Sequence, residues 1–438
     1  MNKKKIAVLG TGMSGFGAAH RLANEPVDVV LYDKASFFGG QTVSYRSPSG
    51  FIFDKGPHVS FTKDERMQNI LADAVDGQFE TVQYQLENHW KGHRMPHPVQ
   101  THMHGLPVEV VAKVIEDFAK QSTVENPQMR NYEDWLVAAY GRYFADNFPV
   151  QYTEKYHTTH PRNLTTDWIG PRMYRPSMEE LLRGALGKQT ATTHYITGFR
   201  YPSRGGFQSY VDKWARNATL KLEHQVTQID PKHKVLTFSN GVRESYDGLM
   251  SSIALPDLIP LIAGVPDDVR AAADQLACSS CVLVNIGVNR PDLTPAHISY
   301  YYDQDIVFSR TSSPHLMSPN NVPPGCGSVQ VEVYFSKKYK PLVGQPADYV
   351  EPVIRDLKRV GLLREDDKIL FTDTKLVEYA NIIFDHDREE ALRTVHGYMD
   401  DNGIRHAGRY GNWAYFWTDD SYKSGEEAAT LALGDIGR

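Results

Sequence analysis

The chain has 438 residues, which is long enough for two or three domains or for one large shared core. Of its residues, 41% are hydrophobic and 23% are charged, a composition typical of a soluble globular protein. Its net charge of −6 disfavours a general nucleic-acid-binding protein, which would need a basic surface. No apolar run approaches the roughly 20 residues of a membrane-spanning helix, and three cysteines are too few for a disulfide framework. We therefore expect a cytoplasmic protein without a membrane span.

The N-terminus predicts a nucleotide-binding βαβ unit, although its lysines and apolar run imitate a signal peptide. We expect a strand at 5–9, a helix ending near Ala23, and a second strand, VDVVLYD, ending at Asp33. Glycines after the first strand let backbone N–H groups approach a pyrophosphate at the helix N-terminus. The Asp33 carboxylate, about 20 residues further on, can accept a ribose hydroxyl. The predicted phosphate loop comprises Gly10, Gly12, Met13, Ser14 and Gly15.

Helices are predicted next, over residues 105–187. Amphipathic helices are expected at 108–121 and at 132–147, and Asn131 is placed to cap the second. Ser177 begins a capping-box pattern that opens a further helix, MEELLRGAL, which Gly187 can close.

β-Structure dominates the second half of the chain. Residues 222–253 predict a β meander in which Asn240-Gly241 forms a hairpin turn. The stretch SVQVEVYF, at 328–335, alternates strictly between polar and apolar residues and predicts a half-buried strand. Near the C-terminus, Ser424-x-x-Glu427 predicts the cap of a final helix.

Two motifs have the residue types of metal or redox sites. Cys278 and Cys281 have the spacing of a redox pair or half a zinc site, but no second CxxC or HxxxH motif accompanies them. The apolar run that follows favours two core thiols. Residues 89–104 hold five histidines among prolines and glycines, which favours a hairpin with solvated or substrate-facing imidazoles over a metal tract. We expect no metal.

The segment after Asp33 favours FAD over NAD. A glycine pair, Gly39-Gly40, resembles the turn that follows the ribose-binding acid in flavoproteins with two dinucleotide-binding folds. DKGPHVSF, at 54–61, resembles the flavin-contacting turn of the superfamily that contains UDP-galactopyranose mutase and the amine oxidases. This resemblance implies that Gly56, Pro57 and His58 pass beside the isoalloxazine. The further FAD contacts that it implies are Lys34, Gln41, Val226, Gly408, Arg409, Trp413, Tyr415, Ser421 and Ser424.

Within this superfamily, three stretches resemble UDP-galactopyranose mutases, especially their eukaryotic-type members, and a fourth is similar to the superfamily as a whole. YTEKYHTTHPRNLTTDWIGPRM resembles their segment from a TEK-W motif to a W-G-R motif, and FSRTSSPHLMSPNN their FYR…SP-N segment. GRYGNWAYFWTDDSYKSGEEA resembles their C-terminal GRFG-W-Y segment, and RYPSRGGFQSYVDKW a turn and helix of the whole superfamily. The stretches lie in the same order over nearly the whole chain.

The resemblance implies roles for individual residues. Arg172 and Arg310 match two arginines that bind the diphosphate of a sugar nucleotide, and guanidinium groups suit such oxygens. Arg175 is a rival for the role of Arg172. The implied catalytic residues are His58, Arg172 and Arg310. The implied substrate-binding residues are Arg172, Arg310, Tyr415, Tyr379, Tyr302, Trp168, Tyr156 and His157.

The fold class implied is α/β, with three domains. We expect a Rossmann-like, glutathione-reductase-type FAD-binding domain with two dinucleotide-binding folds, formed by residues 1–85, 200–255 and 365–438. A helical domain is expected at 105–199, and an antiparallel-sheet substrate domain at 86–104 and 256–364. In the implied reaction, N5 of reduced FAD attacks the anomeric carbon of a nucleoside-diphosphate sugar and expels the nucleoside diphosphate, which stays bound and is added back at the end. The adduct opens, and another hydroxyl closes the ring, so that pyranose and furanose forms interconvert for polysaccharide biosynthesis.

Several features leave alternatives open. Tyr156 and His157 stand where the mutase TEK-W motif has its tryptophan, and VEYANIIF, at 377–384, lacks the prolines expected around its tyrosine. An FAD-dependent oxidase or desaturase, of the amine oxidase or protoporphyrinogen oxidase type, is the alternative enzyme, and a flavin-binding partner protein is a third reading. The sugar, the nucleotide and the electron donor stay open, and a homo-oligomer is compatible with the sequence.

Overall fold

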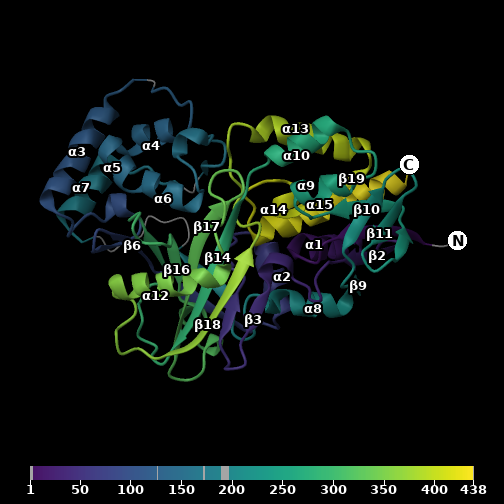
Figure 1. Cartoon of the computed structure of the whole chain (residues 1–438), viewed down its shortest axis with the longest axis horizontal. Coiled ribbons are helices and arrows are strands. Elements are labelled where there is room, and N and C mark those ends of the chain that lie inside the picture. Colours follow the sequence, from purple (N-terminus) through teal and green to yellow (C-terminus); the bar gives the residue numbers. More distant parts are fainter. Residues whose placement is uncertain (1–2, 126, 171–172, 189–196, 438) are drawn as a thin grey trace.

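A computed structural model describes residues 3–125, 127–170, 173–188 and 197–437 (Figure 1). Its first sheet has five parallel strands in the order β19-β13-β1-β2-β9. These strands are β1 (Lys4–Leu9), β2 (Val27–Tyr32), β9 (Leu220–Lys221), β13 (Gly248–Ser251) and β19 (Ile404–His406). Strands from both ends of the chain thus lie side by side, and both termini lie at the right of Figure 1.

Side chains that alternate along β1 pack into different hydrophobic clusters on the two faces of this sheet. Ile6 and Val8 pack with helices, whereas Ala7 and Leu9 belong to a second cluster that includes the β meander. The helices are α1 (Met13–Leu22), α2 (Glu65–Ala74), α8 (Ser209–Asn217) and α15 (Thr418–Ile436). The meander is β10 (Val226–Asp230), β11 (Val235–Phe238) and β12 (Arg243–Ser245), with Gly241 at φ 81° in its second turn. The α/β prediction, including the meander and its turn, is confirmed.

The second large sheet has seven strands, in the order β18-β14-β17-β16-β15-β6-β7. They are β6 (Leu86–Trp90), β7 (His93–Pro96), β14 (Ser279–Val288), β15 (Ile298–Tyr301), β16 (Arg310–Ser312), β17 (Gly327–Ser336) and β18 (Ile369–Val377). All neighbours are antiparallel except β6 and β15, which are parallel, so the prediction of a purely antiparallel sheet is wrong at that pair.

Strand β17 is buried along its whole length, so the prediction of a half-buried strand is wrong. Its apolar residues, with those of β14, pack against helix α12 (Val350–Arg359). The opposite face carries Gln330 and Glu332, and this face is covered by the N-terminal part of the chain, since Gln330 Nε2 donates to the carbonyl of Asp54 at 2.8 Å. Alternation correctly separates the two faces, but the polar one faces another domain instead of solvent.

The helical block comprises α3 (Val108–Ser122), α4 (Tyr132–Tyr140), α5 (Arg142–Asn147), α6 (Pro149–Tyr156) and α7 (Met178–Leu186), at the upper left of Figure 1. The caps at Asn131 and Ser177 are confirmed, the latter as a complete capping box. The single helix predicted at 132–147 is wrong, because Gly141 ends it with φ 80°. A Cβ there would lie 2.8 Å from the Asp117 carbonyl carbon, so close packing against α3 requires this glycine.

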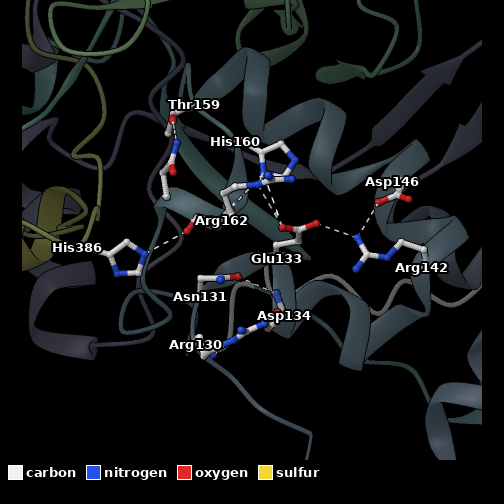
Figure 2. A network of polar contacts seen from close by, with 11 residues as sticks. Arg130, Asn131, Glu133, Asp134, Arg142, Asp146, Thr159, His160, Arg162 and His386 are labelled. Atoms are coloured by element: carbon white, nitrogen blue, oxygen red, sulfur yellow. Dashed lines mark hydrogen bonds and ion pairs between the residues drawn. The ribbon is translucent and has the colours of Figure 1, made fainter.

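A polar network joins the helical block to the segment that follows β18 (Figure 2). Glu133, at the start of α4, accepts a hydrogen bond from Arg142 Nη1 at 2.8 Å and lies 3.5 Å from Arg162 Nε. The carbonyl of Arg162 in turn accepts from His386 Nε2 at 3.1 Å. The backbone N–H of Thr165 donates to the carbonyl of Phe384, which continues this attachment. The network fixes the loop between α6 and Trp168 against the segment that follows β18.

Two of the expected domain limits do not fit the packing. The sequence predicts residues 369–377 in the FAD-binding domain, but they form β18, which pairs with β14 along the seven-stranded sheet. Residues 256–275 are predicted in the substrate domain. They include most of α9 (Leu255–Leu258) and all of α10 (Asp267–Gln275). Helix α10 packs on α13 (Arg388–Asp401), in the same core as the β meander. Backbone pairing decides the place of β18, whose side chains are mostly exposed or half-buried, whereas buried apolar side chains decide the place of α10.

The remaining strands and helices are short. They are β3 (Ser44–Arg46), β4 (Ile52–Asp54), β5 (Phe79–Gln83), β8 (Gly198–Pro202), α11 (Pro314–Met317) and α14 (Gly408–Gly411). The histidine-rich residues 89–104 form the β6–β7 hairpin and the turn after it. Cys278 and Cys281 are free thiols whose pKa values are raised by burial. Within the described ranges, no helix is long and apolar enough to cross a bilayer.

Candidate functional site

The glycine loop after β1 forms a tight turn into α1. Gly10 has φ 117°, and a Cβ there would lie 2.1 Å from Ser252 Oγ. A Cβ at Gly15 would lie 2.2 Å from the carbonyl oxygen of Gly10, so this glycine lets helix and strand pack closely. No side chain caps the N-terminus of α1, which begins with Met13 and Ser14. An uncapped helix N-terminus behind a glycine loop suits a pyrophosphate.

Asp33 lies beside this loop at the end of β2. Its Oδ2 accepts hydrogen bonds from the backbone N–H of Thr11 at 3.0 Å and from Thr11 Oγ1 at 2.6 Å. The second glycine pair folds back onto the loop, because the N–H of Gly39 donates to the carbonyl of Thr11 and a Cβ at Gly12 would lie 3.8 Å from Gly40 Cα. The two glycine turns therefore lie close together, and a side chain at residue 12 would fill the space between them. This open strip of backbone fits a dinucleotide.

Three further predicted cofactor residues are Gln41, Val226 and Lys34. Gln41 Nε2 donates to the carbonyl of Tyr379 at 3.3 Å, which links the glycine turn to the segment after β18. Val226 begins β10 and is buried in the cluster beneath β2. Lys34 is exposed.

The C-terminal segment returns to the same loop. The N–H of Gly408 donates to Ser424 Oγ at 2.8 Å, and a Cβ at Gly408 would lie 2.8 Å from Ser14 Oγ. Ser424 Oγ donates onward to the carbonyl of Ser421. The final helix begins at Thr418, so the predicted start near Ser424 is wrong. Asp420 accepts from the N–H of Trp417 and caps the earlier turn, which leaves Ser424 inside the helix, bound to Gly408.

The DKGPH turn rests on a buried carboxylate. Asp54 accepts hydrogen bonds from Ser44 Oγ, Tyr201 Oη and the N–H of Phe207 at 2.6, 2.8 and 2.9 Å. Burial raises its pKa to about 6, although the three hydrogen bonds oppose the rise. The backbone then turns at Gly56, where φ is 91° and a Cβ would meet no atom within 4 Å.

His58 follows this turn, after Pro57. Its Nδ1 donates to the carbonyl of Gly56 at 2.8 Å, and its ring lies against Phe207. Burial, with a smaller contribution from the positive charge of Arg409, lowers the pKa of His58 to about 4. His58 is therefore neutral at pH 7 and has one ring nitrogen left for another partner.

Across from this turn, the inner face of the seven-stranded sheet carries Arg310. Its Nε and Nη2 donate to the two carboxylate oxygens of Glu332 at 2.6 and 2.9 Å. The guanidinium carbon lies 5.6 Å from the centre of the Tyr156 ring. Arg310 is thus held between the sheet and helix α6.

Tyr156 connects Arg310 to the C-terminal segment. Its hydroxyl donates to Asn381 Oδ1 at 3.1 Å and lies 3.4 Å from the hydroxyl of Tyr415. The Tyr415 ring lies under the guanidinium of Arg409, at 5.3 Å. Arg409 itself donates to the carbonyls of Phe416 and Ala380. A continuous line of polar side chains therefore runs from the sheet to the segment that returns to the glycine loop.

Three other predicted residues make polar contacts outside this line. The Tyr379 hydroxyl donates to Asp257, and the Tyr302 hydroxyl donates to Asn88 in the β6–β7 hairpin. Trp413 is fully buried, and its carbonyl accepts from Arg388. The sequence does not predict these hydrogen bonds, and the substrate and cofactor roles of the three residues stay predictions.

His157 and Trp168 are buried against one another, with ring centres 5.2 Å apart. Burial lowers the pKa of His157 to about 4. Arg172 lies outside the described residues, while its rival Arg175 is exposed.

Four residues of the site are not predicted from the sequence: Asp54, Glu332, Tyr334 and Asn381. Glu332 and Tyr334 lie two residues apart in the alternating stretch 328–335, so the alternation places them on one face. What the sequence does not show is that this face meets Arg310 from β16. Asn381 lies in VEYANIIF, and no local pattern marks its side chain as a partner of Tyr156.

Comparisons with known proteins agree with this geometry. The model of the family described as flavin containing amine oxidoreductase matches residues 13–433. A solved structure of reduced UDP-galactopyranose mutase has a TM-score of 0.92 and 26% identity, covering 99% of this chain and 96% of that chain. These matches confirm the predicted flavoprotein fold, the resemblance to the mutase and FAD as the cofactor.

Curated relatives match over a short stretch. The 4,4'-diaponeurosporene oxygenase of Staphylococcus haemolyticus is 46% identical over 59 residues, which are 14% of this chain and 12% of that protein. The 4,4'-diapophytoene desaturase of Staphylococcus aureus is 37% identical over 60 residues, again 14% of this chain and 12% of that protein. The matched stretch therefore spans far less than two thirds of either relative.

Proposed function

This chain belongs to the family of flavin containing amine oxidoreductases, and we propose that it is an FAD-dependent mutase that interconverts pyranose and furanose forms of a nucleoside-diphosphate sugar. The observation that carries the proposal is the similarity to UDP-galactopyranose mutase over 99% of the chain. The polar line from Arg310 through Tyr156 to Tyr415 supports it, because a diphosphate needs cationic and hydroxyl donors beside the flavin.

The chain's own side chains would bind and orient the substrate. Arg310, together with Arg172, would hold the diphosphate, which must stay in place as the leaving group and return at the end. The hydroxyls of Tyr156 and Tyr415 would donate to its oxygens. Neutral His58 would add no positive charge beside the flavin ring. Reduced FAD would supply an electron-rich N5 that can attack the anomeric carbon.

An FAD-dependent oxidase or desaturase is the second candidate, favoured by the short match to the desaturase and oxygenase relatives. A polyene or another apolar substrate would leave Arg310, Tyr156 and Tyr415 without polar partners when water is expelled, which costs free energy. The arginine and tyrosines therefore favour the mutase.

The test compares both redox states of the purified holoprotein. Dithionite-reduced protein should convert at least one sugar from a panel of UDP-, GDP-, dTDP- and ADP-sugars between its ring forms, as followed by chromatography, and the oxidised protein should not. Arg310→Ala and Arg172→Ala should each weaken sugar-nucleotide binding about 10- to 100-fold, the effect of one charge-assisted contact. Arg175→Ala, at the exposed rival position, should bind normally. Peroxide formation by oxidised protein with an apolar or amine substrate, without ring interconversion, would instead establish the oxidase.

A further inference from the structure

A buried ion pair lies at the centre of the candidate site. Arg310 on β16 and Glu332 on β17 are direct partners in the strand register. Nε of Arg310 donates to Glu332 Oε2 at 2.6 Å and Nη2 to Oε1 at 2.9 Å. The side chain of Glu332 is only 2% exposed and that of Arg310 18% exposed. A carboxylate so completely removed from water must depend on its hydrogen bonds.

Neighbouring side chains hold this pair in one geometry. The Tyr334 hydroxyl donates to Glu332 Oε2 at 2.7 Å, so that oxygen accepts from both Arg310 and Tyr334. The Tyr156 ring lies 5.6 Å from the Arg310 guanidinium carbon. The strand register, the carboxylate and the aromatic ring therefore restrict the rotation of the guanidinium.

A carboxylate in an anion-binding site has an apparent disadvantage, because it repels the anion and neutralises the arginine. Its benefit is orientation. A guanidinium recognises phosphate through a planar fork, and an arginine that is already fixed loses less conformational freedom when the ligand binds. Because Arg310 binds Glu332 through Nε and Nη2, the N–H groups of its Nη1 do not contact Glu332 and can donate to other acceptors. The pair can thus keep its carboxylate contact while Arg310 binds a second anion.

We infer that Glu332 is a positioning residue for the diphosphate of the substrate and acts through Arg310. This inference rests on the proposed function. It differs from two simpler roles for the same carboxylate. If Glu332 only opposed the anion, removing its charge would tighten binding. If Glu332 only supported the fold, its effect on binding would not depend on Arg310.

A double-mutant cycle separates these roles. The variants are Glu332→Gln, Arg310→Lys and the double mutant, prepared as FAD-loaded full-length protein, with UDP, ADP, GDP and dTDP as probes in titration calorimetry. For the diphosphate that wild type binds, Glu332→Gln should weaken binding at least about tenfold, since one charge-assisted contact is misplaced. In the Arg310→Lys background, the same change should weaken it no more than about twofold, because the planar fork is already gone. In turnover with the matching sugar nucleotide, Glu332→Gln should raise KM more than it lowers kcat.

The matched control is a second bidentate pair, largely covered from solvent, just beyond the end of β14. Asp367 is 5% exposed and accepts from Arg290 Nε and Nη2 at 2.5 and 2.9 Å. Asp367→Asn should lower the melting temperature and leave diphosphate affinity unchanged. Glu332→Asp keeps the charge one methylene away and should fall between wild type and Glu332→Gln. It also serves as the test variant if Glu332→Gln does not fold.

Three results would overturn the inference. Unchanged or tighter binding by Glu332→Gln and Glu332→Asp would show that the carboxylate does not position Arg310 for the anion. Equal losses in the wild-type and Arg310→Lys backgrounds would assign Glu332 to the fold alone. Failure of wild type to bind any nucleoside diphosphate would overturn the proposed function as well, and that outcome is visible before any variant is made.

Discussion

The buried carboxylate of Asp54 should make the protein less stable as the pH rises, and Asp54→Asn should remove this effect. Asn keeps the shape of the side chain. Its Oδ1 can accept from Ser44 Oγ and the N–H of Phe207, as Asp54 Oδ1 does. Its Nδ2 would face Tyr201 Oη, which already accepts a hydrogen bond from Asn321 and would have to accept again. The substitution therefore removes the charge with little change in packing.

The magnitude follows from the pKa of Asp54, which burial raises from 3.8 to about 6. Because the folded-state pKa lies above the unfolded one, folded protein binds the proton more tightly. This contribution is complete below the unfolded pKa of 3.8 and is lost as the pH rises through about 6. One pKa unit corresponds to about 1.36 kcal/mol, so the whole loss is about 3 kcal/mol, of which about 1.4 kcal/mol falls between about pH 5 and pH 8.

The assay is reversible denaturant unfolding of wild-type and Asp54→Asn holoprotein, with FAD in excess, at pH 5, 6, 7 and 8. Other titrating groups cancel in the difference between the two proteins. The free energy of unfolding of the variant, minus that of wild type, should rise by about 1.4 kcal/mol from pH 5 to pH 8. A difference that does not change with pH would show that Asp54 titrates normally, and the argument from burial would be wrong.

Two further predictions concern close packing and the network of Figure 2. Gly425→Ala should abolish stable FAD binding, measured as flavin absorbance after gel filtration, because its Cβ would lie 1.9 Å from the carbonyl oxygen of Ser14. Gly434→Ala in the same helix meets nothing within 4 Å and should retain FAD. Glu133→Gln should lower the free energy of unfolding by about 1 kcal/mol, less at high salt, since partly exposed pairs contribute little. Glu389→Gln, which breaks a pair 72–78% exposed, should have no measurable effect.

Local sequence signals predict the parts of the fold that local chemistry decides. The glycine loop, Asp33, the caps at Asn131 and Ser177 and the turn at Gly241 all depend on backbone conformation or on hydrogen bonds between short neighbouring motifs. Each of these features is determined by a few neighbouring residues, so it can be predicted from a single sequence without an alignment.

The errors have a different origin, because each depends on contacts between distant segments. The sequence pattern predicts an amphipathic helix that continues through Gly141. In the structure the helix ends at this glycine, because α3 leaves no room for a side chain there. Ser424 has the pattern of a helix cap, yet it lies within α15 and binds the N–H of Gly408. In both cases a tertiary contact overrides a local preference that is worth only about 1 kcal/mol.

Strand β17 shows how the two kinds of information combine at the site. Its alternation separates an apolar face, which packs on α12, from a polar face with Gln330 and Glu332. Alternation alone assigns the polar face to solvent. In the structure that face is buried, and a buried row of polar groups is costly unless each finds a partner. Here the partners are Arg310, from the neighbouring strand, and the carbonyl of Asp54, at the start of the DKGPH turn. The requirement to satisfy this polar face therefore brings the seven-stranded sheet and the N-terminal part of the chain together at one place.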